Sequence, residues 1–447
     1  LSLSLSLPSA HSGINTPLSW FRLFSEMSSL LLLSLLVPLA FAAPVPNVTD
    51  EVLSKEEREW RLNAIQKLWN ERHTMNHTPL VRVEVNGTPM VEYFIKNETA
   101  SASGTLKHRF VWALILWAVT EGKIKANTSV FDSTSGNTGA SEAYMCRLIG
   151  VNYTAVVADN LEEEKVKQIT QFGGKIMKVP VQLRNYMAEK EAEKTGGFFI
   201  NQFGNANGAE EFHESGDYMM ESTNVFHEIV EDLRTKYNLS YPEYFIHSAG
   251  TGGTISSVGK YITRYNLPTK VVLADSQFSL FYDYVLSNKY SNLSTGDVGR
   301  PNWTAPGVAG IGYGYNPDPI IFKNSTSLLR TVIDEVARMP DMASIAAMRS
   351  LRSLGIDAGA STALNFLVAL FKGIELNPQS EKIRMVIIMG DPGKFYQSTY
   401  LNDDWVENGS PKDLGGLKTL KCWQKKIDDA INFGINFITT NPTSCDI

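Results

Sequence analysis

Three short polar loops contain residue types that could do chemistry together. The first, SGTLKHR at residues 103–109, places Lys107 directly before the apolar stretch at 110–122. The second is STSGNTG at 133–139, and the third is SAGTGGT at 248–254. A lysine in such a place can be a surface charge, or its amine can bind a carbonyl compound covalently. The choice between these two roles for Lys107 therefore depends on what the two other loops could bind.

The third loop suits a single phosphate group. It follows the apolar run YFIH and opens a predicted helix, where backbone N–H groups and the helix dipole favour an anion. Its central residues are Gly250, Thr251, Gly252, Gly253 and Thr254. The glycines let the backbone approach an anion closely, but their spacing fits neither a P-loop nor a dinucleotide-binding loop. The alternative interpretation is an ordinary glycine-rich turn.

The second loop combines hydroxyl and amide side chains at the start of a predicted helix. It could form a nest for a carboxylate, with Asn137 donating a hydrogen bond to a phenolic oxygen. The alternative is an extended helix N-cap. One compound, pyridoxal 5′-phosphate, carries an aldehyde, a phenolic oxygen and a phosphate. It would use Lys107 for a Schiff base, Asn137 for the phenolic oxygen and residues 250–254 for the phosphate, so their joint occurrence predicts this cofactor.

Alternating strand-like and helical stretches must position these loops. Strands are predicted at 81–85, 91–96, 128–132, 153–159, 175–180, 197–202, 244–250, 270–276 and 384–391. Helices are predicted at 50–75, 110–122 (amphipathic), 140–150, 161–173, 183–196, 255–265, 337–355, 363–376 and 421–437, with a polar stretch from about 278 to 325. Apolar strands that alternate with helices imply parallel sheets covered on both faces. Two such blocks predict an α/β protein with two lobes and a cleft between them.

The N-terminal region predicts export. The chain does not begin with Met, and a leucine-rich run starts only after Met27, which we take as the true start. The small-residue pattern at Ala40-Phe41-Ala42 predicts a cleaved secretory signal within residues 1–43. The apolar run is too short for a stable membrane span, and an uncleaved hydrophobic anchor is the alternative.

The glycosylation sequons and the cysteines also bear on the predicted export and on possible ligands. Eleven N-x-S/T sequons begin at Asn47, Asn76, Asn86, Asn97, Asn127, Asn152, Asn238, Asn292, Asn302, Asn324 and Asn408. We expect some of them to be buried and others to carry glycan. Of three cysteines, Cys422 and Cys445 could pair, and no cluster has metal-ligand spacing, so no zinc site is predicted. A net charge of −6 without a basic run argues against a nucleic-acid partner.

Residues from about 75 to 405 resemble the cysteine synthase/cystathionine β-synthase family of fold-type II pyridoxal-phosphate enzymes. The resemblance rests on Thr78-Pro79-Leu80, Lys107, TSGNTG at 134–139 and GTGGT at 250–254, which occur in the family's order. It implies a two-lobed fold like that of tryptophan synthase β, with the cofactor in the cleft between the lobes. With the resemblance we expect a catalytic domain at 44–410 with a small lobe inserted at about 110–205, and a homodimer. The helical pattern of the tail predicts a C-terminal extension at 411–447.

The resemblance also implies substrate contacts. Gln202 in Asn-Gln-Phe resembles the glutamine that contacts the substrate carboxylate, and Thr134, Ser135 and Thr138 would orient the same group. The sequence Gly310-Ile311-Gly312-Tyr313 resembles the loop that closes over the substrate. Within the family, SGTLKHR and PDMASIAAMRSL followed by GIDAGASTALN look most similar to bacterial L-cysteine desulfhydrases.

Two departures from the family pattern affect the expected chemistry. Ser101-Ala102 stands where the family often has an asparagine-proline pair. Pro392 stands where the family usually offers a serine to the pyridine nitrogen, and it has neither a hydroxyl nor an N–H. The ring nitrogen is therefore expected to stay unprotonated unless water or Asp391 reaches it. This disfavours transamination and racemisation and leaves β-elimination and β-replacement accessible.

The expected reaction is β-elimination or β-replacement on L-cysteine or an O-activated L-serine. Lys107 would hold the cofactor and then remove the Cα proton as general base. A serine or threonine dehydratase shares this logic with a different leaving group. A secreted, catalytically silent paralogue is the competing interpretation from another class.

Overall fold

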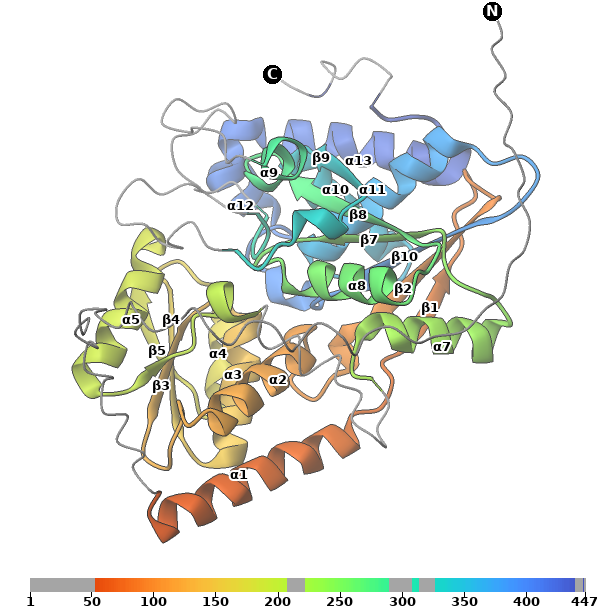
Figure 1. The fold of residues 1–447 in the computed structure, drawn as a ribbon. Helices are drawn as coiled ribbons and strands as arrows, with labels where there is room; N and C mark the ends of the chain where they lie inside the picture. Colours follow the sequence, from red (N-terminus) through yellow and green to blue (C-terminus); the bar gives the residue numbers. More distant parts are fainter. Residues whose placement is uncertain (1–52, 207–221, 289–307, 313–325, 439–444, 446–447) are drawn as a thin grey trace, which may run out of the picture. The chain divides into compact units, whose positions relative to one another are not determined.

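The strands of the computed structural model fall into two sheets (Figure 1). The structure describes residues 53–206, 222–288, 308–312, 326–438 and 445. The predicted signal sequence with Met27, four sequons and Tyr313 lie outside these ranges; the four sequons are those at Asn47, Asn292, Asn302 and Asn324. No helix within the described ranges is long and apolar enough to cross a membrane.

The larger sheet has six strands in the order β1-β2-β10-β7-β8-β9. These are β1 (Leu80–Val83), β2 (Val91–Asn97), β10 (Ile383–Met389), β7 (Tyr244–Ser248), β8 (Lys270–Ser276) and β9 (Glu335–Met339). Only β1 runs antiparallel to its neighbour, and all other pairs are parallel. The C-terminal ends of β10 and β7 therefore meet at one edge of the sheet, where parallel α/β proteins collect their ligands.

Helices cover both faces of the larger sheet because its strands are apolar on both sides. On β7, Ile246 packs in one cluster with α10 (Asp341–Ser353), α11 (Ala360–Leu376) and α13 (Gly416–Phe433). Its neighbour Phe245 packs in another with α7 (Val225–Tyr237) and α8 (Gly253–Arg264). Figure 1 shows α11 and α8 on opposite sides of these strands. The smaller helices are α9 (Phe281–Ser287) and α12 (Asp403–Asn408), with 3-10 turns η1 (Glu98–Ala100), η2 (Val181–Leu183), η3 (Arg330–Val332), η4 (Gly393–Tyr396) and η5 (Ser410–Leu414).

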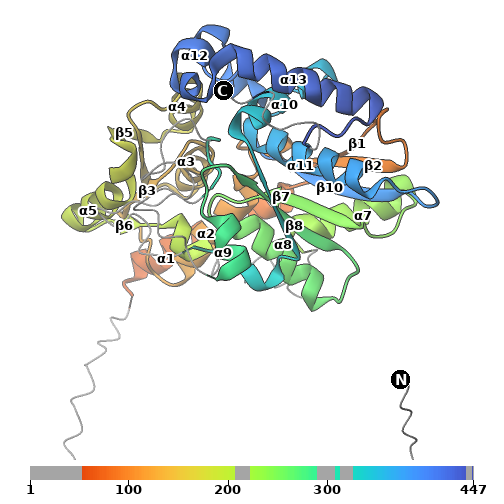
Figure 2. The same cartoon turned by 90° about the horizontal axis from the view of Figure 1, so that it is seen from above.

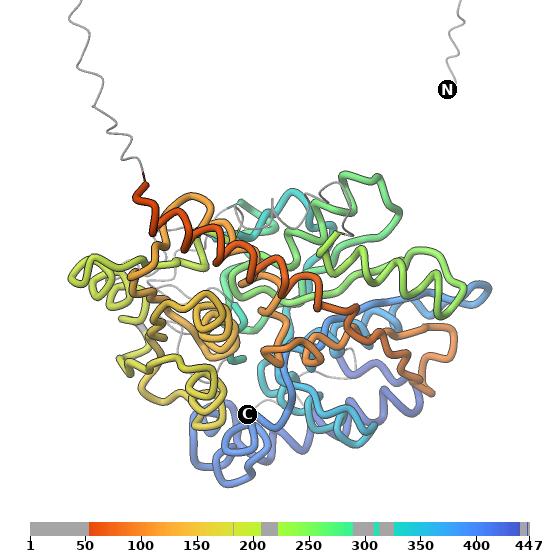
Figure 3. Tube along the Cα trace, turned by 90° about the horizontal axis from the view of Figure 1, so that it is seen from below, coloured from red at the N-terminus to blue at the C-terminus, as the bar shows by residue number. Residues whose placement is uncertain are grey.

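The smaller sheet has four parallel strands in the order β5-β4-β3-β6. They are β5 (Lys175–Val179), β4 (Asn152–Ala158), β3 (Ser129–Ser133) and β6 (Phe198–Phe199). One face packs in a cluster with α1 (Lys55–Thr74), α2 (Lys107–Thr120), α3 (Asn137–Ile149) and α4 (Glu163–Gln171), and α5 (Arg184–Thr195) covers the other. Helix α1 contacts α2 and α3, and Figure 3 shows its full length in red from below.

The predicted α/β class with helix-covered parallel sheets is confirmed, with corrections at single elements. The helix predicted over 337–355 is wrong in its first part, because β9 runs to Met339 and α10 begins only after Pro340. β9 is a mostly half-buried edge strand, so it lacks the apolar run that marks the other strands. Helix α2 is buried on nearly all sides rather than amphipathic. The sequence reasoning also missed α7 and α9.

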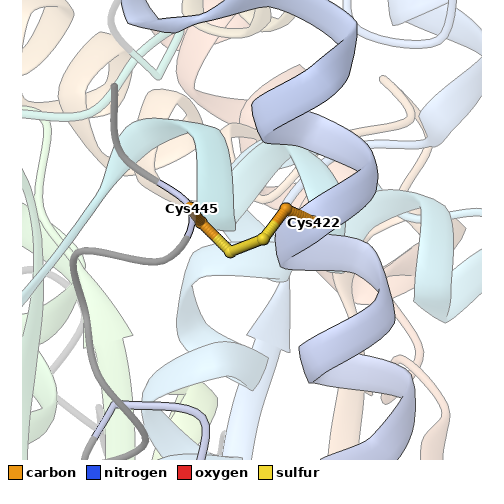
Figure 4. Close-up of a disulfide and its surroundings, with 2 residues drawn as sticks. All are labelled: Cys422 and Cys445. Atoms are coloured by element: carbon orange, nitrogen blue, oxygen red, sulfur yellow. A yellow bond between two sulfur atoms is a disulfide. The ribbon is translucent and has the colours of Figure 1, made fainter.

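A disulfide fastens the C-terminal tail. Cys422 in α13 is bonded to Cys445, with a Cα–Cα distance of 5.6 Å (Figure 4). Helix α13 packs against α10 and α11, and Figure 2 shows it running across them from above. The structure therefore forms the bond that the sequence left open, while Cys146 stays free and buried in α3.

Candidate active site

Lys107 is the first residue of α2, and hydrogen bonds shape the loop before it. The Ser101 hydroxyl donates to the Thr105 carbonyl oxygen at 2.7 Å and accepts from the Thr105 N–H at 3.1 Å. The Thr105 hydroxyl in turn accepts from the Lys107 N–H at 3.2 Å. Ser101, which replaces the asparagine of the family's usual pair, thus closes this loop and fixes the start of the helix.

Arg109 anchors the first turn of α2 to the larger sheet. Its Nε lies 2.8 Å from Glu98 Oε2, and its Nη1 lies 2.8 Å from Glu228 Oε1 in α7. Burial disfavours the Arg109 charge, but the two carboxylates raise the pKa of Arg109 above its usual range. The fully buried Lys96 adds a second cation 3.0 Å from Glu228. These ion pairs fix Arg109, two residues after Lys107, and so hold the first turn of α2 in place.

The Lys107 amine is half-buried, and its protonation is coupled to two neighbours. Burial lowers the pKa of Lys107 to about 8, although the Asp391 carboxylate works against this shift. Burial and the charge of Lys107 lower the pKa of His247, in β7, to about 3. Lys107, Asp391 and His247 therefore belong to one electrostatic site. A lysine with this pKa is neutral often enough at physiological pH to act as a nucleophile or base.

Asn137 begins α3 and faces the end of β10. Its Nδ2 donates to Asp391 Oδ2 at 2.9 Å, and its Oδ1 is buried without a hydrogen-bond partner among the described residues. Gly136 before it has φ of +127°, and a Cβ there would lie 2.7 Å from Lys165 Cδ. The chain can therefore bring Asn137 into the site only with glycine at position 136.

The predicted substrate residues of this loop are bonded to one another. The Thr134 hydroxyl accepts two N–H groups of its own loop at 3.0 Å each. The Thr138 hydroxyl donates to Gln202 Oε1 at 2.8 Å, and Gln202 Nε2 donates to the Ser133 carbonyl oxygen at 2.7 Å. The structure brings these side chains together, and their roles toward a substrate stay predictions.

Residues 250–254 connect β7 to α8. Gly252 is the N-cap of α8 with φ of +87°, and Gly253 is its first residue. The buried Thr251 hydroxyl accepts from the Gly253 N–H at 3.3 Å, and Thr254 is half-buried in the first turn. The loop thus opens a twelve-residue helix, and the N–H groups and dipole at a helix start favour an anion.

Two close backbone approaches explain why this loop is glycine-rich. A Cβ on Gly252 would lie 2.3 Å from the Leu328 nitrogen, and a Cβ on Gly250 would lie 2.3 Å from the Gly310 carbonyl oxygen. On the other side, the Ser135 hydroxyl lies 3.3 Å from the position of a Cβ on Gly310. Gly310 therefore sits between the two loops that are predicted to bind the phosphate and the substrate.

Asp391, and not Pro392, contacts Asn137 at the end of β10. Pro392 pairs with Ala358 in an isolated antiparallel bridge, and its ring offers no hydrogen bond. The Asp391 carboxylate is buried, and its Oδ2 accepts from Asn137 Nδ2 at 2.9 Å and from the Tyr396 hydroxyl at 2.6 Å. Position 392 thus offers no hydrogen bond through its side chain, while Asp391 directs a carboxylate oxygen toward Asn137.

Comparison with known proteins identifies the family. A family model described as pyridoxal-phosphate dependent enzyme matches residues 72–391, which is more than half of the 447-residue chain. The chain belongs to this family. The match spans Lys107 and all three loops, and the predicted cofactor is confirmed at the level of the family.

Relatives place the chain among pyridoxal-phosphate enzymes of cysteine and related sulfur amino acids. The L-cysteine desulfhydrase Cds1 of Mycobacterium tuberculosis is 31% identical, over 78% of this chain and 90% of that one. A Caenorhabditis elegans protein, named provisionally as pyridoxal-phosphate dependent without a stated reaction, is 55% identical over 90% of this chain and 92% of that one. The crystal structure of O-ureido-L-serine synthase shares the fold, with a TM-score of 0.60 at 24% identity over 77% of this chain and 97% of that one.

The residues of the site fit the family's cofactor. Lys107 supplies an amine of lowered pKa for the aldehyde, and residues 250–254 supply a glycine-rich helix start for the phosphate. Asn137 Oδ1, Asp391 Oδ1 and Ser248 Oγ are buried and have no hydrogen-bond partner among the described residues. Unpaired buried polar atoms are costly, so a polar ligand that reaches them would stabilise the site.

Sequence reasoning missed several residues of the site. His247 directly precedes the glycine-rich loop, and its position there was a usable signal. The sequence contained no signal for Lys165 and Tyr396, because they are far apart along the chain. Only the fold brings them together, with the Lys165 amine 4.3 Å from the centre of the Tyr396 ring. Asn365, whose Nδ2 lies 3.3 Å from His247 Nδ1, is equally remote in sequence.

Proposed function

We propose that the protein catalyses β-elimination or β-replacement on L-cysteine or an O-activated L-serine, with pyridoxal phosphate held by Lys107. The bound cofactor supplies the electron sink that makes the Cα proton of an amino acid removable. Lys107 binds the cofactor through its amine and, once the amino acid displaces it, takes the Cα proton as general base. Sulfide as the second substrate would yield cysteine, whereas hydrolysis would yield pyruvate, ammonia and, from cysteine, hydrogen sulfide.

One observation carries this proposal: the half-buried Lys107 amine, with its pKa lowered to about 8, belongs to the same site as the Asn137–Asp391 contact. An amine that is readily neutral can both attack an aldehyde and accept a proton at physiological pH. The named activity of the 31% identical relative, an L-cysteine desulfhydrase, supports the choice of substrate class.

The remaining residues orient the substrate in this proposal. Thr134, Ser135 and Thr138 line the start of α3 and would hold the amino-acid carboxylate, with Gln202 bracing Thr138 at 2.8 Å. Gly310 lies between Gly250 and Ser135 and would border the substrate from the side of the phosphate loop. All of these groups are uncharged, so they would position a small carboxylate by hydrogen bonds rather than neutralise its charge.

The anchor is tested by absorption spectra of the purified protein. The parent should show a visible band from the covalently bound cofactor, and Lys107→Ala should lose it. Lys165→Met is the matched control, because Lys165 is a buried lysine whose charge acts on Asp391, and its loss should leave a covalent band in place. A band that persists in Lys107→Ala would overturn the assignment.

Substrate choice is tested by the release of sulfide from L-cysteine and of 2-oxo acid from four amino acids. The 2-oxo acid is pyruvate from L-cysteine, O-acetyl-L-serine and L-serine, and 2-oxobutyrate from L-threonine. Fastest turnover of L-cysteine or O-acetyl-L-serine supports the proposal. Fastest turnover of L-serine or L-threonine would make the protein a dehydratase. Protein that carries no cofactor and releases no sulfide would support a silent paralogue.

We also propose that the chain passes through the secretory pathway. Seven sequons lie in the described ranges, and six of their asparagines are exposed: Asn76, Asn86, Asn127, Asn152, Asn238 and Asn408. Asn97 is half-buried, and its side chain accepts two hydrogen bonds from Thr99. The Cys422–Cys445 disulfide supports the same compartment, since such bonds persist in oxidising environments.

A further inference from the structure

The start of α2 and the end of β10 are joined by the backbone, which fixes Asp391 relative to Lys107. The Leu106 N–H donates to the Gly390 carbonyl oxygen at 2.9 Å. A Cβ on Gly390 would lie 3.0 Å from Leu106 Cδ2, so the two segments are in contact. Lys107 and Asp391 are the next residues on each segment. The backbone hydrogen bond therefore fixes where the Lys107 and Asp391 side chains start relative to each other.

The Asp391 carboxylate is held from several sides. Oδ2 accepts from Asn137 Nδ2 at 2.9 Å and from the Tyr396 hydroxyl at 2.6 Å. Oδ1 has no hydrogen-bond partner among the described residues and lies over Gly359, where a Cβ would come within 1.9 Å of it. Gly359 is the N-cap of the 17-residue helix α11, so the dipole of that helix favours the ionised carboxylate. The fold thus holds the Asp391 carboxylate in place, and Gly359 leaves space for it.

The charged groups that act most on Asp391 are Lys165 and Glu162, at the start of α4. Lys165 in α4 is 2% exposed, lies 4.3 Å from the Tyr396 ring centre and pairs with Glu162 at 3.3 Å. Burial raises the pKa of Asp391, while Lys165, Tyr396 and Asn137 oppose that rise and Glu162 adds to it. On the Lys107 side, the facing groups are Asp391 and His247, and burial keeps His247 neutral.

We propose that Asp391 is a positioning residue that controls the charge of the Lys107 amine, with Tyr396 and Lys165 holding its carboxylate in place. The neighbouring Pro392 cannot supply a proton or a hydrogen-bond donor. Asp391 is therefore the acid through which this site differs from the serine-containing pattern of the family it resembles. The inference deepens the proposed function and rests on it only in that Lys107 is the reacting amine.

The test measures Lys107 protonation directly in the apoenzyme. Reductive methylation with formaldehyde is run between pH 6 and 10, and the modification of the Lys107 peptide is followed by mass spectrometry. The parent profile should have its midpoint near pH 8. Asp391→Asn should move the midpoint down by roughly one pH unit, so that labelling well below it becomes roughly tenfold faster. Tyr396→Phe should shift it in the same direction by less.

Asp357→Asn is the matched control. Asp357 lies beside the same turn, where its Oδ2 accepts from the Lys394 N–H at 3.2 Å. Its side chain is 46% exposed, and the charge that acts on the pKa of Lys107 is that of Asp391. The profile of Asp357→Asn should equal that of the parent. An unshifted midpoint in folded Asp391→Asn, or in folded Tyr396→Phe if Asp391→Asn unfolds, would overturn the inference. So would an equal shift in Asp357→Asn.

These outcomes are separate from the fate of the proposed function. If Lys107→Ala keeps the covalent cofactor, the anchor assignment fails while the labelling profiles still stand. If the profiles do not shift while Lys107→Ala loses the cofactor, only the role of Asp391 fails.

Discussion

Burial disfavours both a positive and a negative charge in and near the site. It makes the Lys107 cation costly, and it makes the carboxylates of Asp132 and Glu142 costly beneath the loop at 133–139. Both effects couple proton binding to folding. The stability of the apoenzyme should therefore depend on pH in directions that can be worked out for each group.

Lys107→Met should stabilise the apoenzyme at neutral pH by about 1–3 kcal/mol. The lysine pKa is about 8 in the folded chain, against an ordinary value of 10.5. The cost of its charge is therefore fully present below pH 8 and disappears as the pH rises toward 10.5. Urea unfolding at pH 7 and pH 10 measures the difference. Lys55→Met, at a side chain that is 84% exposed, should show no such trend. An equal gain at both pH values would contradict this account.

Glu142→Gln should stabilise the protein at pH 8 by roughly 1–2 kcal/mol and much less at pH 5. Burial, and then the Asp132 charge, raise the pKa of Glu142 well above its usual value, and burial raises the pKa of Asp132 to about 7. The stability that these acids contribute is full below about pH 4 and is lost as the pH rises through their folded pKa values. The glutamine can still accept the Tyr153 hydroxyl, which lies 2.6 Å from Glu142 Oε2. Thermal unfolding at both pH values measures the gain in stability. A larger gain at pH 5 than at pH 8 would contradict the raised pKa values of Glu142 and Asp132.

At the scale of elements, the glycine-rich loop depends on two separate constraints. Gly252 needs a positive φ of +87°, and its Cα faces the Leu328 backbone. Gly150, at the C-cap of α3, needs a similar φ of +83° but has nothing within 4 Å of a Cβ. The two positions therefore separate backbone strain from steric clash.

Gly252→Ala should weaken cofactor binding and destabilise the chain by more than Gly150→Ala. The matched Gly150→Ala should cost about 1–2 kcal/mol from its backbone conformation alone and leave cofactor binding unchanged. The excess cost at Gly252 reports the clash at 2.3 Å with the Leu328 nitrogen. Fluorescence titration of apoenzyme with pyridoxal phosphate, together with urea unfolding, measures both. Equal effects of the two substitutions would show that the close approach has no part in the site.

Local patterns in the sequence predict the elements and loops of this site better than its electrostatics. Lys107, Asn137 and the glycines at 250–254 stand at strand-to-helix junctions that apolar periodicity reveals. β9 was missed because an edge strand that is half-buried has no apolar run. The Asp391–Tyr396–Lys165 arrangement was missed because it joins α4 to the end of β10. No periodicity within one segment contains that contact, and only the packed chain creates it.

At the scale of the whole molecule, the disulfide ties the tail to α13 and thus to α10 and α11. Cys445→Ser should lower the free energy of unfolding by about 3 kcal/mol, because the bond closes a loop with a sequence separation of 23. Urea unfolding without reductant measures the loss. Reductant should bring the parent to the level of the variant and leave the variant unchanged. A further loss on reduction of the variant would show that another thiol is involved.

The proposed export predicts that the protein carries N-linked glycan and lacks its signal sequence. Protein expressed in a eukaryotic secretory host should migrate faster on a gel after treatment with peptide N-glycosidase, and it should begin near residue 44 by N-terminal sequencing. The six exposed sequons should carry most of the glycan, and Asn97, whose side chain is hydrogen-bonded to Thr99, should carry the least. Peptide mapping assigns the sites. Unmodified protein retained in the cytosol would refute the proposed route.

The position of β10 has a consequence for how the chain is made. Among the described strands, β10 is the last to leave the ribosome, yet it pairs with β2 on one side and β7 on the other. The larger sheet is therefore incomplete until synthesis has passed Met389, and Lys107 cannot meet Asp391 until synthesis has passed Asp391. Until then, β2 and β7 each have an edge that β10 does not yet cover. Uncovered strand edges in a partly made chain are prone to aggregate. A truncation before Ile383 should consequently yield insoluble chain rather than a weaker enzyme.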